Sequence, residues 1–427
     1  MSKRQIVIVG GGVAGLDLAN QLAGTPAKQL EFDVRLVDRE PAHIWKPMLH
    51  TIAAGTADAS AVEASFIAQA RKRGFRFDPG EVIAIDRTRR KIRLSPLKID
   101  GVEVVPERDI AYDTLILAAG SRANDFGTPG VAQYCLTIDC RKEAMAFNNR
   151  LRIDLVRAVA LGRPIAIAIV GGGATGVELA AELIRIAEVV EQHGAAGARD
   201  NLQVTLIESQ SRILGPFPEK VARAALCVLE DLGIKVLTNR RVASADSHGF
   251  SFNGGERIDA DILLWAAGVR APRFIADIDG VDHSKLGQIV VNARLASSDP
   301  AIYALGDCAS VVAKQNDAPL PTTAQVAFQQ SVYLGRYLPA MLQGCDVPEF
   351  RYRDFGSLVS LGGYAAYGTM GRFGFFKGGF LRGRVAQLGH AFLYRRHQAR
   401  IYGPVRGSLL WLAEILASPA RPKERLS

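Results

Sequence analysis

Two short apolar runs in the chain are each followed by a glycine turn and then by a helical pattern. The first run and turn read IVIVGGGVAG over Ile6–Gly15, and the second read IAIVGGGATG over Ile167–Gly176. Apolar residues then recur with the helical period over Leu16–Leu22 and Val177–Ile186. An uninterrupted apolar run is typical of a parallel strand that is buried on both faces. The pattern therefore predicts two strand-turn-helix units, each opening a parallel sheet.

Each unit is followed by another apolar strand that ends in an acid. The strand VRLVD ends at Asp38, and the strand VTLIE ends at Glu208. In dinucleotide-binding folds an acid at the end of the second strand accepts hydrogen bonds from ribose hydroxyls. The fold class that follows is α/β, with two Rossmann-like dinucleotide-binding domains.

Two further strands with similar turns mark where we expect the chain to pass between the domains. They read DTLILAAGSR over Asp113–Arg122 and ADILLWAAGVR over Ala260–Arg270. A later strand, AIYALGDCAS, runs into a Gly-Asp turn. The expected domains are an FAD-binding domain at residues 1–120 and 275–345, an NADH-binding domain at 121–274, and a C-terminal region at 346–427.

The glycines of both turns fall on the G-x-G-x-x-G positions at which a pyrophosphate approaches the backbone. They are Gly10, Gly12 and Gly15 in the first turn, and Gly171, Gly173 and Gly176 in the second. One such pattern is weak support, because glycines also occur where a helix simply packs against a strand, but here strand, turn, helix and acid recur together. Two dinucleotides in one chain predict hydride exchange between them. Glu208 favours NADH over NADPH, because a carboxylate repels a 2′-phosphate.

The net charge of +9 comes from one end of the 427-residue chain. Residues 371–427 contain nine Arg, two Lys and two Glu, so they carry the whole excess. Apolar residues recur at helical spacing from Leu381 and again after Gly403–Pro404, with Trp411 alongside. A cationic amphipathic segment is typical of a helix at a membrane surface, although a dimer interface or a nucleic-acid surface has a similar pattern.

The cysteines and histidines favour neither disulfide nor metal chemistry. The five cysteines form an odd set, and the start of the chain lacks an apolar secretory segment, so we expect a reducing cytosolic compartment. Cys135 and Cys140 have C-x4-C spacing but lie beyond the turn at Ala118–Gly120, where we interpret them as ordinary thiols. The seven histidines show no metal-ligand spacing, and we predict no metal site.

Three side chains have both a structural and a functional interpretation from the pattern alone. Glu178 lies two residues after Gly176, where an acid either interacts with the helix dipole or positions a substrate. Gln325 and Gln329 lie four residues apart in PTTAQVAFQQ, so their amides share one helix face. That face contacts either water or a flat acceptor with carbonyl groups, such as a quinone.

Together these motifs resemble the bacterial type II NADH dehydrogenases, single-subunit NADH:quinone oxidoreductases that pump no protons. The resemblance covers nearly the whole chain and is most specific in AQVAFQQ, FGSLVSLGGY and GRVAQLGHAFLYRRHQ. It implies a pyridine-nucleotide-disulfide-reductase fold, one non-covalent FAD, NADH as substrate, and electron transfer to ubiquinone or menaquinone. It also implies a homodimer, peripheral attachment of the basic tail to the cytoplasmic face of the plasma membrane, and no nucleic-acid partner.

The same resemblance implies roles for individual residues. The FAD residues would be Gly10, Gly12, Gly15, Asp38, Lys46, Gly120, Asp307, Ala324 and Gln325. The NADH residues would be Gly171, Gly173, Gly176, Glu178, Glu208 and Gly268. The catalytic residues would be Glu178, Gln325 and Gln329. Two other functions remain open: a soluble NADH-dependent flavoprotein reductase with a non-quinone acceptor, and a nucleotide-sensing protein without turnover.

Overall fold

The chain folds into two compact units, each assembled from separate stretches of sequence. The computed structural model describes residues 3–25, 28, 31–311, 319–370, 380–382 and 384–417. Unit 1 consists of Met1–Lys46, Glu63–Arg122 and Val269–Tyr352. Unit 2 consists of Pro47–Val62, Ala123–Gly268 and Arg353–Ser427. The chain passes between the units at the short strands β12 (Arg122–Ala123) and β20 (Val269–Arg270), among other places.

Unit 1 is built around a five-stranded parallel sheet in the order β22-β11-β1-β2-β5. Its strands are β1 (Arg4–Val9), β2 (Phe32–Asp38), β5 (Arg76–Pro79), β11 (Thr114–Leu117) and β22 (Ile302–Ala304). The central strand β1 is the first apolar run of the sequence, and its residues Ile6, Val7 and Ile8 are fully buried. The predicted parallel sheet around the first copy is confirmed.

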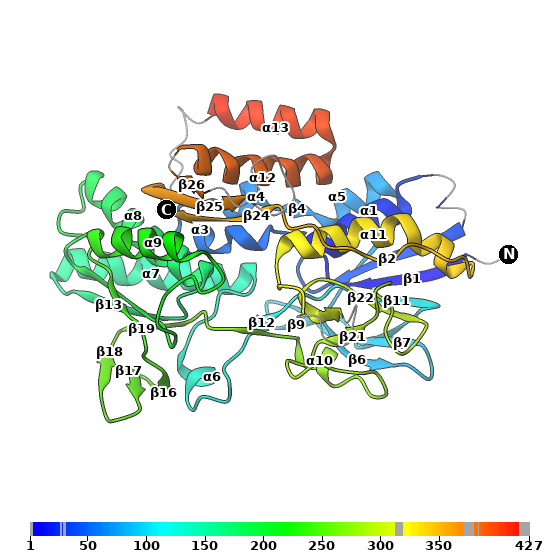
Figure 1. Ribbon diagram of the computed structural model, residues 1–427, viewed down its shortest axis with the longest axis horizontal. Helices are drawn as coiled ribbons and strands as arrows, with labels where there is room; N and C mark the ends of the chain where they lie inside the picture. Colours follow the sequence, from blue (N-terminus) through cyan, green and yellow to red (C-terminus); the bar gives the residue numbers. More distant parts are fainter. Residues whose placement is uncertain are drawn as a thin grey trace. The chain divides into compact units, whose positions relative to one another are not determined.

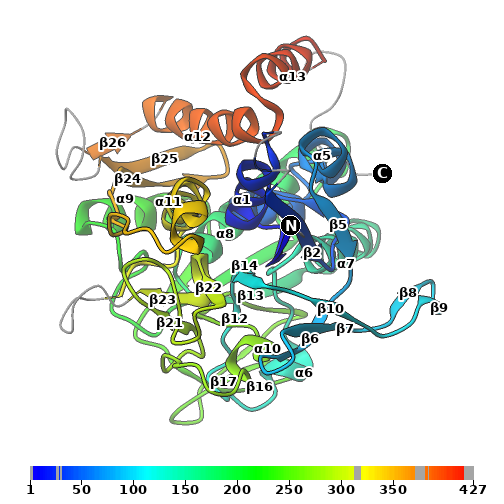
Figure 2. The same cartoon turned by 90° about the vertical axis from the view of Figure 1, so that its right-hand side faces the viewer.

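Helices cover one face of this sheet, and an antiparallel sheet lies on its other face (Figures 1 and 2). The helices are α1 (Val13–Ala23), α5 (Phe66–Arg73) and α11 (Ala324–Leu342), and α1 packs directly against α11. The antiparallel sheet has the strands β6 (Val82–Asp86), β7 (Lys91–Leu94) and β10 (Arg108–Ala111). Figure 2 shows the hairpin of β8 (Leu97–Ile99) and β9 (Val102–Val105) extending outward from it. The smaller elements are β3 (Ala42–His43), the 3-10 helix η1 (Lys46–Met48), β4 (Ala64–Ser65), α10 (Arg273–Ala276), β21 (Ile289–Val291) and β23 (Ala309–Val311).

Unit 2 repeats the arrangement with a four-stranded parallel sheet in the order β15-β14-β13-β19. Its strands are β13 (Ile165–Val170), β14 (Leu202–Ile207), β15 (Lys235–Leu237) and β19 (Ile262–Trp265). The helices of this part are α6 (Val131–Tyr134), α7 (Arg141–Leu161), α8 (Ala174–Gln192) and α9 (Glu219–Asp231). The antiparallel strands are β16 (Val242–Asp246), β17 (Gly249–Phe252) and β18 (Arg257–Asp259). Phe250 and Phe252 of β17 pack in one buried cluster with Trp265, so the second predicted Rossmann-like sheet is confirmed together with its covering layer.

The segment Pro47–Val62 is separate in sequence from the rest of unit 2 but packs within it. Its helix α3 (Leu49–Ala54) contacts α7 and α8, and Asn148 of α7 donates a hydrogen bond to the Ala53 carbonyl oxygen (3.1 Å). The short helix α4 (Ala59–Val62) ends the segment. The expected FAD-binding domain includes these residues in its range of 1–120, and that assignment of ligands to domains stays a prediction.

The C-terminal part of unit 2 is an antiparallel sheet followed by two helices. Its elements are β24 (Gly356–Leu361), β25 (Ala365–Met370), β26 (Phe380–Arg382), α12 (Arg384–Tyr402) and α13 (Pro404–Ala417). The prediction of a helical pattern from Leu381 is wrong at its start, because Leu381 pairs with Gly368 in the sheet and the helix begins at Arg384. The predicted break is confirmed at Gly403, whose φ is 87°.

Part of the predicted basic tail, residues 371–379 and 418–427, lies outside the described residues, as do the side chains of Val385 and Leu388. Along α13 six large apolar side chains are each exposed by 43% or more: Val405, Leu409, Leu410, Trp411, Leu412 and Leu416. Among the helices of the described chain, none combines the length and the apolar character that crossing a membrane requires.

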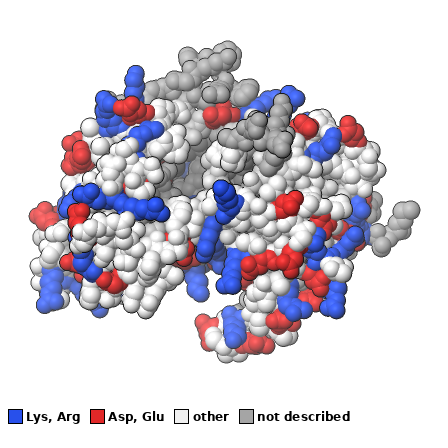
Figure 3. Space-filling model, turned by 60° about the horizontal axis from the view of Figure 1, so that its bottom comes forward, with Lys and Arg blue, Asp and Glu red and all other residues white. Residues whose placement is uncertain are grey.

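Opposite charges are interspersed on the antiparallel sheet of unit 1. Lys91 and Arg93 lie 3.8 and 3.1 Å from the carboxylate oxygens of Asp109. Figure 3 shows basic and acidic side chains next to one another on the face that it presents. Exposed pairs of this kind contribute little to stability, about 0–1 kcal/mol each. Because positive and negative charges alternate, this sheet has no surface of a single charge sign.

Candidate nucleotide and electron-transfer sites

The first glycine turn joins β1 to α1 and leaves space at its centre. A Cβ atom at Gly10 would overlap the Ala118 carbonyl oxygen, and one at Gly15 would overlap the Gly10 carbonyl oxygen. A Cβ atom at Gly12 would instead meet no described atom within 4 Å. Gly12 also precedes the first turn of α1, which no side chain of the described residues caps. The N–H groups at this helix start therefore suit an anion, and the turn fits the pyrophosphate of a dinucleotide.

Asp38 ends β2 beside this turn. Its Oδ2 accepts a hydrogen bond from the Gly11 N–H (2.6 Å), and its Oδ1 accepts one from the Glu40 N–H (2.8 Å). Burial raises the pKa of the Asp38 carboxyl above its ordinary value, and the two N–H bonds partly oppose this shift. A carboxylate has about four lone-pair positions, so Asp38 keeps acceptor capacity for ribose hydroxyls.

A chain of polar contacts connects Lys46 to Asp307 through Ser121. Ser121 follows Gly120, whose φ of 67° turns the chain at the end of β11. Its hydroxyl donates to Asp307 Oδ2 (2.8 Å), and Lys46 Nζ donates to the carbonyl oxygen of Ser121 (3.2 Å). The structure therefore brings three of the predicted FAD residues, Lys46, Gly120 and Asp307, to one place.

Two buried glutamines hold the backbone of the Gly-Asp turn, the 3-10 helix η2 (Gly306–Cys308). Gln330 Oε1 accepts a hydrogen bond from the Gly306 N–H (2.6 Å), and Gln288 Nε2 donates to the Asp307 carbonyl oxygen (2.8 Å). Gln330 is only 1% exposed. The sequence analysis selected Gln329 and missed Gln330, although the two are adjacent in the same motif.

The segment AQVAFQQ forms the first turns of α11. Thr323 caps this helix, since its Oγ1 accepts from the Val326 N–H (3.3 Å). Gln325 and Gln329 are both half-buried, one turn apart, and Ala324 opens the helix. Gln325 Oε1 accepts a hydrogen bond from the Tyr352 hydroxyl (3.2 Å), which orients the amide.

The second glycine turn repeats the geometry of the first within unit 2. A Cβ atom at Gly171 would lie 2.7 Å from the Ala266 carbonyl oxygen, and one at Gly176 would overlap the Gly171 carbonyl oxygen. At Gly173 a Cβ atom would find empty space to 4 Å as far as the chain is described. Gly173 precedes α8 as Gly12 precedes α1. This turn fits a second pyrophosphate.

Glu208 directly follows β14, and Asp38 is the last residue of β2. Its Oε2 accepts a hydrogen bond from the Gly172 N–H (2.8 Å), and its Oε1 accepts one from the Gln210 N–H (2.8 Å). Both predicted ribose acids therefore bind the N–H of the middle glycine of their own turn.

Gly268 lies in the turn after β19, on the same carboxyl-terminal edge of the sheet as Gly171. Its φ is 62°, and a Cβ atom there would approach the Phe126 ring to 2.5 Å. Trp265 Nε1 donates to the Asn124 carbonyl oxygen (2.8 Å), and the Asn124 N–H donates to the Gly268 carbonyl oxygen (3.3 Å). These bonds fix the end of the strand beside the second turn.

Glu178 lies at the start of the second turn of α8, in a buried polar cluster. Its side chain is 9% exposed, its Oε1 accepts from the Ser360 N–H (3.0 Å), and His50 Nδ1 lies 3.5 Å from its Oε2. The pKa of Glu178 is raised to about 8, mainly by burial and also by the negative charge of Glu182, while the Ser360 hydrogen bond opposes the rise. Near neutral pH this carboxyl is therefore largely protonated.

Glu182, one turn further along α8, is the second acid of the cluster. Its side chain is 5% exposed, its Oε2 accepts from Thr56 Oγ1 (2.7 Å), and Arg185 Nη1 lies 3.5 Å away. Burial raises the pKa of Glu182, while the Thr56 hydroxyl and the Arg185 charge lower it. The sequence analysis missed Glu182, Thr56 and His50. A signal for Glu182 was present, since it lies four residues after Glu178.

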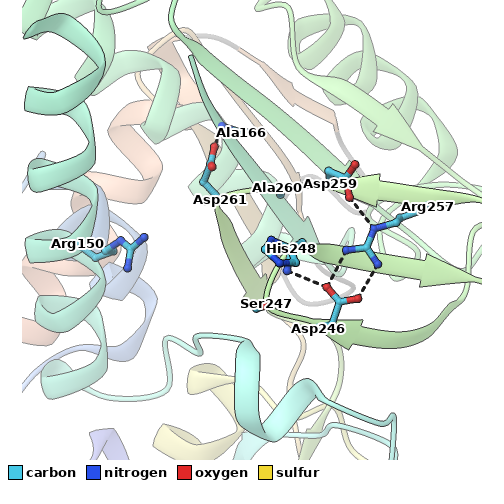
Figure 4. A pocket seen from close by; sticks show the side chains of 9 residues that line it. All are labelled: Arg150, Ala166, Asp246, Ser247, His248, Arg257, Asp259, Ala260 and Asp261. Carbon is cyan, nitrogen blue, oxygen red and sulfur yellow. Dashed lines mark hydrogen bonds and ion pairs between the residues drawn. The ribbon is translucent and has the colours of Figure 1, made fainter. Parts of the chain in front are cut away.

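A shallow depression in unit 2 lies at the opposite edge of the sheet from the second turn (Figure 4). Ala166 and Asp261 of its wall stand at the amino-terminal ends of β13 and β19, whereas Gly171 follows the carboxyl end of β13. Arg257, at its rim, binds both Asp246 and Asp259 at 2.6 Å. Ligands of open α/β sheets bind at the carboxyl ends of the strands, so we do not assign a nucleotide to this depression.

The thiols and carboxylates form no further redox or metal centre in the part of the chain that is described. Cys135 and Cys140 are thiols, not a disulfide. No group of three or more His, Cys, Asp or Glu side chains converges there as a metal site requires.

Known proteins resemble this chain in sequence and in structure. The profile of the pyridine nucleotide-disulphide oxidoreductase family matches residues 4–331. A type II NADH:quinone oxidoreductase of Haemophilus influenzae is 35% identical over 99% of this chain and 100% of that protein. Another, of Staphylococcus aureus, is 27% identical over 86% of this chain and 90% of that protein. The structure of NDH2 from Plasmodium falciparum in complex with NADH superimposes with a TM-score of 0.86 at 17% identity, each chain being fully covered, and has the same fold.

Proposed function

The chain belongs to the type II NADH:quinone oxidoreductases, and we propose that it oxidises NADH and reduces a membrane quinone through a bound FAD without pumping protons. The observation that carries the proposal is that the chain has two glycine turns of the same geometry. Each turn precedes a helix that no described side chain caps, and in each an acid accepts a hydrogen bond from the N–H of the middle glycine. Two dinucleotides on one chain provide a hydride donor and a hydride acceptor.

FAD is assigned to unit 1. Gly10, Gly12 and Gly15 provide the close approach and the N–H groups for its pyrophosphate, and Asp38 accepts from its ribose. The other residues that hold it are Lys46, Gly120, Asp307, Ala324 and Gln325. When bound, FAD supplies the flavin that takes the hydride of NADH and passes two electrons to the quinone.

NADH is assigned to the second turn in unit 2. Gly171, Gly173 and Gly176 receive its pyrophosphate, Glu208 accepts from its ribose, and Gly268 lies on the same sheet edge. Glu208 accepts two backbone N–H groups beside the turn, and a carboxylate at this position repels a 2′-phosphate. NADH is therefore preferred to NADPH.

The quinone is assigned to the two amides of α11. Amide N–H groups of Gln325 and Gln329 donate to quinone carbonyl oxygens, and Tyr352 keeps the Gln325 amide oriented. Glu178, protonated near neutral pH, holds a proton for the reaction. Ubiquinone and menaquinone both present the carbonyl groups that these side chains recognise.

The C-terminal helices are assigned to the cytoplasmic face of the plasma membrane. The exposed apolar side chains of α13 provide the inserting surface, and Arg395, Arg396 and Arg400 of α12 provide charge for anionic lipid headgroups. The protein is thus peripheral and works as a homodimer.

Anaerobic stopped-flow absorbance of the flavin tests the assignment. NADH is expected to bleach the purified yellow protein, and a short-chain quinone is expected to restore the colour. Because Gln325 is also assigned to FAD, Gln325→Ala is compared with the wild type at equal flavin content, where it should slow the second step about tenfold or more by removing a donor to the quinone. Gln343→Ala, an exposed amide at the far end of the same helix, is the matched control and should leave both steps unchanged. Bleaching that quinone does not reverse would show that the acceptor is not a quinone.

A further inference from the structure

Two buried acids stand one turn apart on α8, with His50 3.5 Å from Glu178 and Arg185 3.5 Å from Glu182. Residues four apart on a helix have Cβ atoms about 5–6 Å apart. Glu178 and Glu182 are both more than nine-tenths buried. Two ionised carboxylates at this separation repel each other strongly away from water, so one of them is stable only in the neutral form.

The first copy of the repeat shows that the fold does not require an acid at the second position. In α1 the equivalent residues are Asp17 and Gln21, and Gln21 Nε2 donates to Asp17 Oδ2 (2.6 Å). An amide one turn after the acid satisfies that acid directly. In α8 the chain has Glu182 in place of this amide, at the cost of a second buried carboxyl.

The pair has a partly exposed neighbour at its Glu182 end. The Arg185 side chain is 32% exposed and contacts Glu182, whereas the side chains of Glu182, Glu178 and His50 are each exposed by 9% or less. The helix α3 contributes His50, with Thr56 just beyond it, and β24 contributes the Ser360 N–H. The facing strands β13 and β14 read IAIAIV and LQVTLI and carry no ionisable residue.

We propose that Glu182 is a positioning residue of the reaction: it keeps one proton on the Glu178–Glu182 pair and renews that proton from solvent at the Arg185 end. This inference rests on the proposed function. NADH, one proton and quinone give NAD⁺ and quinol. The hydride supplies both electrons and one proton, so the second proton of the quinol comes from water. The pair takes up that proton at Glu182 and releases it from Glu178, and its charge is restored in each turnover.

The electrostatics of the pair agree with this role. The negative charge of Glu182 raises the pKa of Glu178, and Thr56 and Arg185 lower that of Glu182. The proton therefore resides mainly on Glu178, the residue further from the exposed arginine. Substitution of Glu182 by an amide is expected to lower the pKa of Glu178.

Infrared spectroscopy of the FAD-loaded protein, recorded without NADH or quinone as a function of pH, tests the pair directly. The wild type is expected to show a protonated-carboxyl band that disappears near pH 8, and Glu178→Gln should remove it. Glu182→Gln, which reproduces the sequence of the first copy, should keep the band and lower its midpoint by about one pH unit. Glu188→Gln is the matched control, because Glu188 is on the same helix but binds the Tyr364 hydroxyl. An unchanged midpoint in Glu182→Gln overturns the proposal.

The pH profile of quinone-driven flavin reoxidation tests the link to turnover. Glu182→Gln should shift the alkaline limb of this profile to lower pH by the same amount, and Glu188→Gln should not. If Glu182→Gln fails to fold, Thr56→Val replaces it. Loss of the Thr56 bond should raise the midpoint of the first ionisation of the pair, and an unchanged midpoint again overturns the proposal. If quinone does not reoxidise the wild type, the proposed function fails, while the infrared result still decides the state of the pair.

Discussion

The two glycine turns have the same backbone, yet the helices that follow them carry different chemistry. In α1, Asp17 accepts hydrogen bonds from Gln21 and from the Ser331 hydroxyl (2.7 Å) of the neighbouring α11. In α8, the equivalent Glu178 receives one backbone N–H and faces a second acid. The glycines are fixed by backbone contacts common to both copies, whereas the helix face is set by the element that packs on it. A repeat therefore conserves the ligand turn more strictly than the chemistry beside it.

The largest expected effect comes from the last glycine of each turn. Gly15→Ala and Gly176→Ala place a methyl group on a carbonyl oxygen of their own turn, and each should cost about 3 kcal/mol or more. Gly15→Ala should release FAD, and Gly176→Ala should retain FAD but weaken NADH binding. Gly12→Ala and Gly173→Ala have room for the methyl group and should affect only ligand affinity. Flavin content, NADH titration and thermal unfolding distinguish these outcomes, and loss of FAD in Gly176→Ala would contradict the assignment of one ligand to each turn.

The next effect is the pH dependence of the free energy of unfolding that Glu178 of α8 causes. The pKa of Glu178 is raised from 4.5 to about 8 in the folded protein. Between pH 4.5 and about pH 8 the folded protein therefore keeps a proton on Glu178 that the unfolded chain has lost. This contribution to stability is complete below about pH 4.5 and is lost as pH rises through about 8. Between pH 5 and 8 the free energy of unfolding should fall by about 2–3 kcal/mol more in the wild type than in Glu178→Gln. Urea unfolding at several pH values measures it, and parallel curves would refute it.

A moderate effect concerns the choice of nucleotide. Glu208→Gln keeps an oxygen for the Gly172 N–H but removes the charge that repels a 2′-phosphate. The preference for NADH over NADPH in flavin bleaching should fall about tenfold, or roughly 1.4 kcal/mol. Asp38→Asn, the same change in the first copy, should leave this preference unchanged and weaken FAD retention instead. Equal effects of both variants on NADPH use would remove the distinction between the turns.

The smallest effect tests the hydrogen bond from the Gly306 N–H to Gln330, which holds the Gly-Asp turn of unit 1. Gln330→Met removes the acceptor of the buried Gly306 N–H while keeping the size of the side chain. We expect a loss of about 1–2 kcal/mol in stability and weaker FAD binding, because an unsatisfied buried N–H is costly. Denaturant unfolding and FAD titration of the apoprotein measure both, with Gln343→Ala as the exposed control. A wild-type FAD affinity in Gln330→Met would show that the turn needs no support from α11.

The parts of the fold that depend on short patterns were predictable. Strand, turn, helix and terminal acid lie within a few tens of residues, and each obeys a local rule of period or backbone geometry. The start of the C-terminal helix was not predictable, because the pattern around Leu381 fits both a helix and a strand. The pairing of Leu381 with Gly368 makes it a strand residue. That strand pairing cannot be predicted from the spacing of apolar residues alone.

Contacts between distant segments explain the rest. His50, Thr56 and Ser360 meet α8 from two stretches of chain that no periodicity connects. Gln329 and Gln330 differ by about 100° around a helix, so the one that binds the Gly-Asp turn depends on the rotation of α11, which the packing against α1 sets.

The interleaving of the two units imposes an order on biosynthesis. All strands of the second parallel sheet have left the ribosome once Trp265 has emerged, so the second turn can form early. The first turn begins at the N-terminus, but its sheet lacks β22 and its Gly-Asp turn lacks the support of α11 until Leu342 has emerged. A nascent chain thus carries an unfinished edge next to β11 through most of translation. The site assigned to FAD, although first in the gene, is the last of the two to be completed.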